Sequence, residues 1–301
     1  MRWIELRRSK IKVYGQKNRL AFKGLDEEHT LFLHGLLTND VKGMPPFSVS
    51  YHLMLRQNGA PIREFFLYKL QDHYLLDTPD PAKQVIEDLE KRKLSLKVYL
   101  EDLTPNYRHI FLLGEDSKDF VEKVWGNAPQ EGRLIVEGSV IIAHNSVRFR
   151  ETGYDLIGEL SDLELPESLM MTTEEAENLR IRRCIPAVGK ELREGFSPLE
   201  AGVLRYAISL NKGCYVGQEA IARVYYRGRT PRTLVLLQAE GLREGEKLFD
   251  GDKQVGTVTS VGSEGYALGY VLRVHAQKEK VLYTPEGTAV KLIKVCEEVV
   301  P

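Results

Sequence analysis

The sequence has few cysteines, no dominant charge and no long apolar run. Only three cysteines, Cys184, Cys214 and Cys296, occur among 301 residues, far apart and without a CxxC pair. This spacing argues against a disulfide framework, a four-thiolate zinc site and an iron–sulfur cluster held by the chain itself. Lysine and arginine total 42 against 43 acidic residues, so no global field draws the chain onto nucleic acid or anionic lipid.

No segment reaches the length of a membrane-spanning helix, and the first residues alternate charged with apolar groups, unlike a secretory signal. We therefore expect a cytoplasmic protein with no membrane partner and no direct contact with nucleic acid. Apolar residues make up 43% of the chain and charged residues 28%, which is typical of globular proteins, and the length allows two domains.

Hydrophobic periodicity predicts strands and helices that interleave irregularly, which favours the α+β class over a doubly wound parallel sheet. Strands are expected at residues 19–24, 51–55, 62–70, 74–76, 94–100, 107–113, 133–144 and 147–149. Helices are expected after an N-cap at Asp26 and at residues 81–93, 117–125 and 172–184. Short strands at residues 234–238, 254–260, 267–272 and 289–295, separated by glycine-rich turns, predict a small C-terminal β-barrel.

Residues 211–223 are the densest cluster of unusual residues. Gly213 and Gly217 bracket Cys214, and we expect both glycines to allow positive φ or a close backbone approach. Lys212 and Arg223, if close in space, would favour the Cys214 thiolate. A second interpretation is that Cys214 is a small buried apolar residue ahead of a helix. Composition alone leaves both interpretations open.

The segment Lys212-Gly213-Cys214-Tyr215-Val216-Gly217-Gln218-Glu219 resembles the K-G-C-Y-x-G-Q-E signature of the YgfZ family. These are folate-binding-type proteins implicated in making or maintaining iron–sulfur enzymes. Residues 36–41 (LLTNDV) and 255–260 (VGTVTS) extend the resemblance over nearly the whole chain. The family is itself similar to the aminomethyltransferase (T-protein) of the glycine cleavage system, whose T-P-L-E-A-G stretch residues 197–202 (SPLEAG) resemble.

The resemblance implies an aminomethyltransferase-like folate-binding region at residues 1–229, followed by the β-barrel at residues 230–301. It implies tetrahydrofolate as the cofactor and Cys214 as the reactive residue, with no metal held by the chain. The implied ligand-binding residues are Asn39, Asp40, Tyr51, Arg182, Glu200, Lys212, Gly213, Tyr215, Gly217, Gln218, Glu219 and Arg223. The implied partners are a folate-type small molecule and iron–sulfur client proteins or their assembly machinery.

The chain departs from the transferases after the turn at Asn58-Gly59. Those enzymes carry an acidic pair there that takes part in folate chemistry, whereas this chain has Arg63 and Glu64. An arginine keeps its proton and cannot act as a general base, so aminomethyl transfer is disfavoured. Glu64 is the alternative acid, but a solvated Arg63–Glu64 pair is the simpler interpretation.

A second departure lies at Arg182, where the family has a glutamate that accepts hydrogen bonds from the pterin. Arginine offers only donors, so we expect weaker folate binding than in relatives with glutamate there. Three alternatives stay open: another acid such as Glu191 or Glu200 replaces it, the ligand binds differently, or folate binding has been lost.

Three functions follow from these observations. The first is an accessory protein, not a classical enzyme, that supports iron–sulfur cluster assembly or repair in client enzymes, including tRNA-modifying ones, through Cys214. The second is a tetrahydrofolate-dependent aminomethyl transferase. The third is an interaction module with a vestigial pocket.

Overall fold

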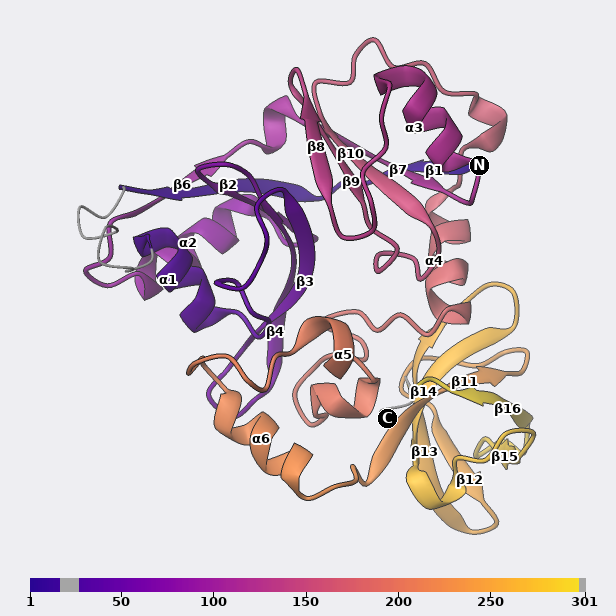
Figure 1. The fold of residues 1–301 in the computed structure, drawn as a ribbon. Coiled ribbons are helices and arrows are strands. Elements are labelled where there is room, and N and C mark those ends of the chain that lie inside the picture. Colours follow the sequence, from indigo (N-terminus) through magenta and orange to yellow (C-terminus); the bar gives the residue numbers. More distant parts are fainter. Residues whose placement is uncertain (17–26, 298–301) are drawn as a thin grey trace. The chain divides into compact units, whose positions relative to one another are not determined.

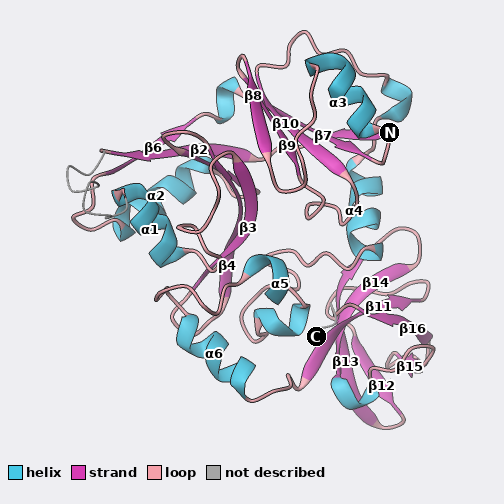
Figure 2. Cartoon of the chain, in the orientation of Figure 1, coloured by secondary structure: helices cyan, strands magenta, loops and turns pink. Residues whose placement is uncertain are grey.

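The structure, a computed structural model, describes residues 1–16 and 27–297 (Figure 1). The expected strand at residues 19–24 and the N-cap at Asp26 lie outside these residues. Helices and antiparallel sheets are mixed along the chain, which confirms the α+β class (Figure 2). The chain packs as two units. The first comprises Met1–Met54, Arg63–Met171 and Tyr206–Val216, and the second comprises Leu55–Ile62, Thr172–Arg205 and Gly217–Pro301. The domain division at residues 229 and 230 stays a prediction.

One five-stranded sheet of the first unit has the order β1-β7-β10-β9-β8. Its strands are β1 (Arg2–Glu5), β7 (Arg108–Leu113), β8 (Leu134–Glu137), β9 (Val140–His144) and β10 (Gly153–Gly158). Helix α3 (Ser117–Trp125), found where it was predicted, buries Val121 against this sheet together with Trp3 and Ile142. Two short 3₁₀ helices also belong to this unit, at Thr104–Asn106 and Glu167–Leu169.

The second sheet of this unit has the order β3-β4-β5-β2-β6. Its strands are β2 (Ser9–Gly15), β3 (Ser48–Leu55), β4 (Pro61–Lys69), β5 (Tyr74–Thr78) and β6 (Val98–Asp102). The predicted turn between β3 and β4 is present, with Gly59 at φ 83° and its N–H donating to the Arg56 carbonyl. Helix α1 (Glu28–Leu36) precedes β3, and α2 (Ala82–Arg92) buries Val85 and Leu89, one helical turn apart.

Four helical segments follow the two sheets in the chain: α4 (Thr173–Arg182), a 3₁₀ turn (Pro198–Ala201), α5 (Leu204–Ala207) and α6 (Gln218–Tyr226). Helix α4 begins as the sequence predicts. The Thr172 hydroxyl accepts a hydrogen bond from the Glu175 N–H, and the Glu175 carboxylate accepts one from the Thr172 N–H. This reciprocal capping box satisfies two N–H groups that the helix leaves unpaired.

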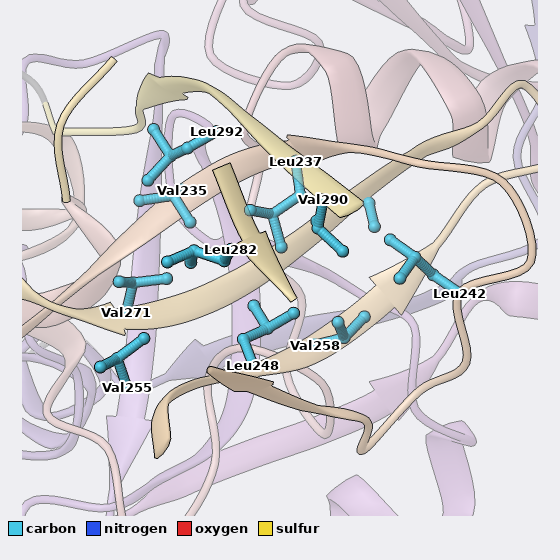
Figure 3. Packing of buried hydrophobic residues seen from close by; sticks show 11 residues of the cluster. Val235, Leu237, Leu242, Leu248, Val255, Val258, Val271, Leu282, Val290 and Leu292 are labelled. Carbon is cyan, nitrogen blue, oxygen red and sulfur yellow. The ribbon is translucent and has the colours of Figure 1, made fainter. Parts of the chain in front are cut away.

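The C-terminal strands close into a six-stranded barrel of order β11-β14-β13-β12-β15-β16, which confirms the predicted barrel. The strands are β11 (Arg232–Gln238), β12 (Lys247–Asp250), β13 (Lys253–Val261), β14 (Tyr266–Leu272), β15 (Val281–Tyr283) and β16 (Ala289–Val295), with a 3₁₀ turn at Arg273–His275. Branched aliphatic side chains such as Val235, Leu248 and Leu282 fill its interior (Figure 3). The short strands β12 and β15 were not predicted.

A disulfide joins Cys184 to Cys296, 112 residues apart, although the spacing of the cysteines argued against a disulfide framework. Both residues are buried. They follow α4 and β16 respectively, so the bridge ties the segment after α4 to the end of the barrel. Sequence spacing does not reveal such a pair, because only the fold brings the two Cα atoms to 5.5 Å.

Residues 147–149, predicted as a strand, form a turn, and the strand β10 that follows was missed. The turn directs Arg148 into the interior between the two sheets of the first unit. There the Arg148 guanidinium donates to Asp155 Oδ1 on β10 at 2.7 Å and to Asp77 Oδ2 on β5 at 2.7 Å. One buried cation therefore connects an acid of each sheet.

The same two acids bind further buried groups. Asp77 also accepts hydrogen bonds from Lys10 Nζ and Arg8 Nε, each at 2.8 Å. Asp155 also accepts from Tyr68 and Asn145 and contacts His109 Nε2 at 2.8 Å. We call Arg148, Asp77, Asp155 and the side chains that contact the two acids the ion network. Buried charges are costly unless every one is paired, and here each acid faces several donors.

The ion network determines the protonation of Asp155. Burial alone would raise the pKa of this carboxyl, but Arg148 and hydrogen bonds from His109 and Asn145 outweigh burial and hold the pKa at about 2. Burial lowers the pKa of His109, so its imidazole is neutral near pH 7.

A carboxyl whose pKa falls on folding stabilises the protein above its unfolded pKa and loses that contribution as the pH falls through the folded one. Asp155 should therefore contribute on the order of 2–3 kcal/mol well above pH 4, and this contribution should be lost progressively as the pH falls through 4 toward 2. Urea unfolding across this range checks the slope. Asp155→Asn should reduce the slope and lower stability by about 3–5 kcal/mol, because Arg148 loses a partner. Asp162→Asn, at an exposed position, is the control; an equal effect of both substitutions would contradict the assignment.

Candidate functional site

Residues 211–217, which we call the cysteine loop, are anchored to the C-terminal end of α1. Lys212 Nζ donates to the carbonyl oxygens of His34, Leu37 and Asn39 at 2.6, 2.5 and 2.8 Å. These carbonyls lie in the last turn of α1 and just beyond it, where a cation is favoured. Burial lowers the pKa of Lys212 to about 8, although the Asp40 carboxylate acts in the opposite direction.

Lys212 therefore holds the loop in place and has no N–H left to donate to Cys214. Arg223, the other residue expected to favour the thiolate, lies on α6 and pairs with Glu219 at 2.8 Å. Both side chains of that pair are mostly exposed. Lys212 and Arg223 thus each bind another group of the chain, and the expectation that they favour the Cys214 thiolate stays a prediction.

Cys214 itself is an exposed, free thiol. Two residues beside it in the loop, Lys212 and Tyr215, are buried, and the Lys212 ammonium lies 4.9 Å from the centre of the Tyr215 ring. The N–H of Val216 donates to the Gly35 carbonyl at 3.2 Å, which fixes the loop on the other side of the cysteine. The interpretation of Cys214 as a buried apolar residue is therefore wrong. The chain presents this thiol to solvent from an anchored loop.

The two glycines of the loop differ. Gly217 has φ 85°, and a Cβ there would lie 2.6 Å from the Arg56 carbonyl oxygen and 2.9 Å from Leu55 Cβ. Gly213 has no positive φ, and a Cβ there would meet only His34 Nε2, at 4.0 Å. The expectation of a backbone requirement for glycine is confirmed at Gly217 and wrong at Gly213. Gly217 is the N-cap of α6, whose first helical residue is Gln218.

Asn39 and Asp40 follow α1. Asn39 Nδ2 donates to the carbonyls of Tyr206 at 2.9 Å and Tyr51 at 3.2 Å, so this amide braces two backbone segments. Asp40 Oδ1 accepts from the Gly43 N–H at 2.9 Å, and 45% of the Asp40 side chain is exposed. Asp40 therefore keeps acceptor capacity toward solvent, whereas the Asn39 amide group is occupied.

Tyr51, Glu64 and Arg8 form a hydrogen-bonded cluster that the sequence did not predict. Its hydroxyl donates to Glu64 Oε2 at 3.2 Å, and Arg8 Nη1 donates to Glu64 Oε1 at 3.2 Å. The Tyr51 ring packs against Phe66 and Tyr206. Burial, with Glu64 adding to it, raises the pKa of Tyr51 well above its ordinary value, so the hydroxyl stays protonated. Successive side chains of a strand point to opposite faces, so the sequence of β4 could have indicated that Glu64 lies on the face opposite to Arg63.

The expectation of a solvated Arg63–Glu64 pair is wrong. Arg63 Nη1 lies 2.7 Å from Asp80 and its Nε lies 3.3 Å from Asp88, both on the side of the strand opposite to the Glu64 contacts. The carboxylate of Glu64 is thus separated from Arg63 and held by Arg8 and Tyr51.

Two acids of the second unit, Glu191 and Glu200, are hydrogen-bonded to other residues of the chain. Glu200 is buried, caps Ser197 and accepts two hydrogen bonds from Arg232. Glu191 is fully buried and accepts hydrogen bonds from Arg180, Thr259, Ser260 and the Ala187 N–H. Neither carboxylate has the free acceptors that a pterin edge needs.

Arg182 lies near the end of α4 and pairs with Glu264 at 3.2 Å, with nearly half of its side chain exposed. The partner of Glu200 is Arg232, not Arg182. The Arg182 guanidinium therefore pairs with a carboxylate of the barrel.

The fold is that of a glycine cleavage system enzyme. The structure matches the crystal structure of aminomethyltransferase T from Bartonella henselae with a TM-score of 0.80, covering 98% of this chain and 85% of that one at 18% identity. No protein-family model matches the chain.

Sequence relatives agree with the fold. The chain is 26% identical over 254 residues to an aminomethyltransferase of Lysinibacillus sphaericus, covering 76% of this chain and 68% of that protein. It is 24% identical over 300 residues to an aminomethyltransferase of Oceanobacillus iheyensis, covering 90% and 79%. An uncharacterized protein of Aquifex aeolicus is 56% identical over 128 residues, which is 42% of this chain and 86% of that protein. The chain thus has aminomethyltransferase-like relatives by sequence and by structure; membership of the YgfZ family stays a prediction.

Within residues 1–16 and 27–297, no helix is long and apolar enough to cross a membrane. The same part of the chain contains no group of three or more His, Cys, Asp or Glu side chains placed to hold a metal ion.

The two glycines of the cysteine loop provide a matched test. Gly217→Ala should lower the free energy of unfolding by about 2–3 kcal/mol, because it combines positive φ with a clash against the Arg56 carbonyl. Gly213→Ala should change it by no more than about 0.5 kcal/mol. Urea denaturation of both variants measures the difference. Equal losses of stability would show that the loop geometry is wrong.

Proposed function

We propose that this protein binds a tetrahydrofolate-type ligand and supports the assembly or repair of iron–sulfur clusters in client enzymes, including tRNA-modifying enzymes. Cys214 is the reactive group, and the protein acts in the cytoplasm as an accessory factor. The exposed Cys214 thiol on an anchored loop carries this proposal. The aminomethyltransferase relatives support its folate part.

The chemistry requires a thiolate. When Cys214 loses its proton to solvent, the sulfur can donate an electron pair to an iron ion of a client's cluster. A serine hydroxyl stays protonated at neutral pH and binds iron poorly. Because Lys212 and Val216 anchor the loop to α1, the thiol is presented with little loss of conformational freedom.

The proposed ligand-binding residues have different parts to play. Asp40, Gln218 and Glu219 offer polar side chains, and Gly213 and Gly217 bring backbone groups close to a ligand. Tyr215 and Tyr51 offer ring faces. Asn39, Lys212 and Glu200 act by positioning the segments that carry these groups, since each is bound to another part of the chain. Arg223 holds Glu219 through an ion pair within α6.

A Cys214→Ser substitution tests the role of the thiol. Cys214 is exposed, so the variant should unfold within about 0.5 kcal/mol of the parent. It should nevertheless fail to restore iron–sulfur enzyme activity in a deletion strain under oxidative stress. Iodoacetamide should label the native, unreduced parent once, at Cys214, and leave the variant unlabelled, because Cys184 and Cys296 are bonded to each other. Full restoration by the serine variant, or undiminished client activity in the deletion strain, would overturn the proposal.

The Glu64 carboxylate favours a second candidate function, aminomethyl transfer to tetrahydrofolate. It supplies an acid one residue beyond Arg63, and Arg8 and Tyr51 hold it in position. In this reaction the donor's methylene carbon forms bonds to two nitrogens of tetrahydrofolate, while its bonds to the amino group and to the carrier break. The two protons lost by tetrahydrofolate pass to the released ammonia and to the carrier.

Calorimetry with tetrahydrofolate and an assay for methylene-tetrahydrofolate separate the two functions. The accessory role predicts binding without turnover. The transferase predicts turnover that falls at least about a hundredfold in Glu64→Gln, the loss expected for a general acid–base group. Lys69→Gln, on the same strand, is the control. No binding of tetrahydrofolate would contradict the folate part of both functions.

A further inference from the structure

The second unit contains a cavity of about 650 Å³ that plays no part in the proposed function. It is lined by the segment around α5, the C-terminal half of α6 with the residues that follow it, the turn after β14 and the end of the barrel chain. All of its lining residues belong to one packed unit. The volume lies in the range of small-molecule sites.

The charges on the cavity wall are unbalanced. Three arginines, Arg205, Arg229 and Arg273, face one acid, Glu297. Glu297 is already neutralised, because Arg273 Nη1 donates to its Oε2 at 2.8 Å and Arg273 Nη2 donates to its Oε1. The guanidinium groups of Arg205 and Arg229 make no hydrogen bond or ion pair with any residue that the structure describes. Two guanidinium groups are therefore left without a counter-charge.

The rest of the wall is largely apolar. Leu204 and Val224 line it, together with the ring of Tyr225. Tyr225 meets the neighbouring Tyr226 edge to face, with ring centres 5.3 Å apart, which restricts its orientation. A ligand that fills this space therefore needs an apolar body as well as a negative charge.

We propose that this cavity, the arginine pocket, binds a small organic anion whose carboxylate or phosphate is carried on an apolar ring. The planar fork of an arginine binds both head groups through paired hydrogen bonds. In the arginine pocket, Arg229 and Arg205 bind the head group and Tyr225 packs against the ring. The site does not rest on the Cys214 chemistry, so each proposal can fail without the other.

Ligand-detected NMR and calorimetry with phenyl phosphate, benzoate and neutral benzamide test the pocket. At least one of the two anions should bind at one site per chain, and benzamide at least about tenfold more weakly, because it lacks the charge. Whichever anion binds more tightly identifies the preferred head group. Benzamide binding as tightly as both anions would overturn the proposal.

Matched arginine variants locate the site. Arg229→Ala should weaken binding of the preferred anion about tenfold, since it removes a charge-assisted contact. Arg227→Ala removes an exposed arginine two residues away that does not line the cavity, so it should leave the affinity unchanged. Leu204→Trp should abolish binding by filling the space. Equal effects of the two arginine variants, or full affinity in Leu204→Trp, would show that the anion binds elsewhere on the surface.

Discussion

The first unit depends on one interaction, the contact of the buried Arg148 guanidinium with Asp77 on one sheet and Asp155 on the other. Each of these charges, alone in the interior, would destabilise the fold by several kcal/mol. Together they require β5, β10 and the turn after β9 to meet in one arrangement. Arg148 also lies 4.0 Å from the centre of the Phe66 ring, which adds a cation–π contact.

The cysteine loop applies the same principle at a helix end. Lys212 is stable in its buried position only because three carbonyls accept its N–H groups, and those carbonyls need a donor because α1 ends there. One lysine thus satisfies the helix and anchors the loop. Cys214 needs no contact of its own to be held in position, which leaves its sulfur available for chemistry.

The fold is that of an aminomethyltransferase, and several polar residues that the sequence singled out bind other residues of the chain. Arg63 binds Asp80 and Asp88, Arg182 binds Glu264, and Glu191 is fully occupied by the chain. A fold of this kind does not by itself fix an activity, because the chemistry resides in the residues placed on it. The partners of these residues therefore bear more directly on function than the likeness of the fold to an aminomethyltransferase does.

The sequence alone determined the features that depend on neighbours along the chain: the helices at α2, α3 and α4, the turn at Gly59 and the existence of the barrel. It also indicated the cysteine loop, since glycines beside a cysteine are a local pattern. Only the tertiary structure decided the partners of Arg148, the bond between Cys184 and Cys296, the position of Glu64 beside Tyr51, and the exposure of Cys214. Periodicity reports which side of a strand or helix a residue occupies. A buried ion pair or a disulfide depends on residues that the chain separates by tens of positions, and only packing brings them together.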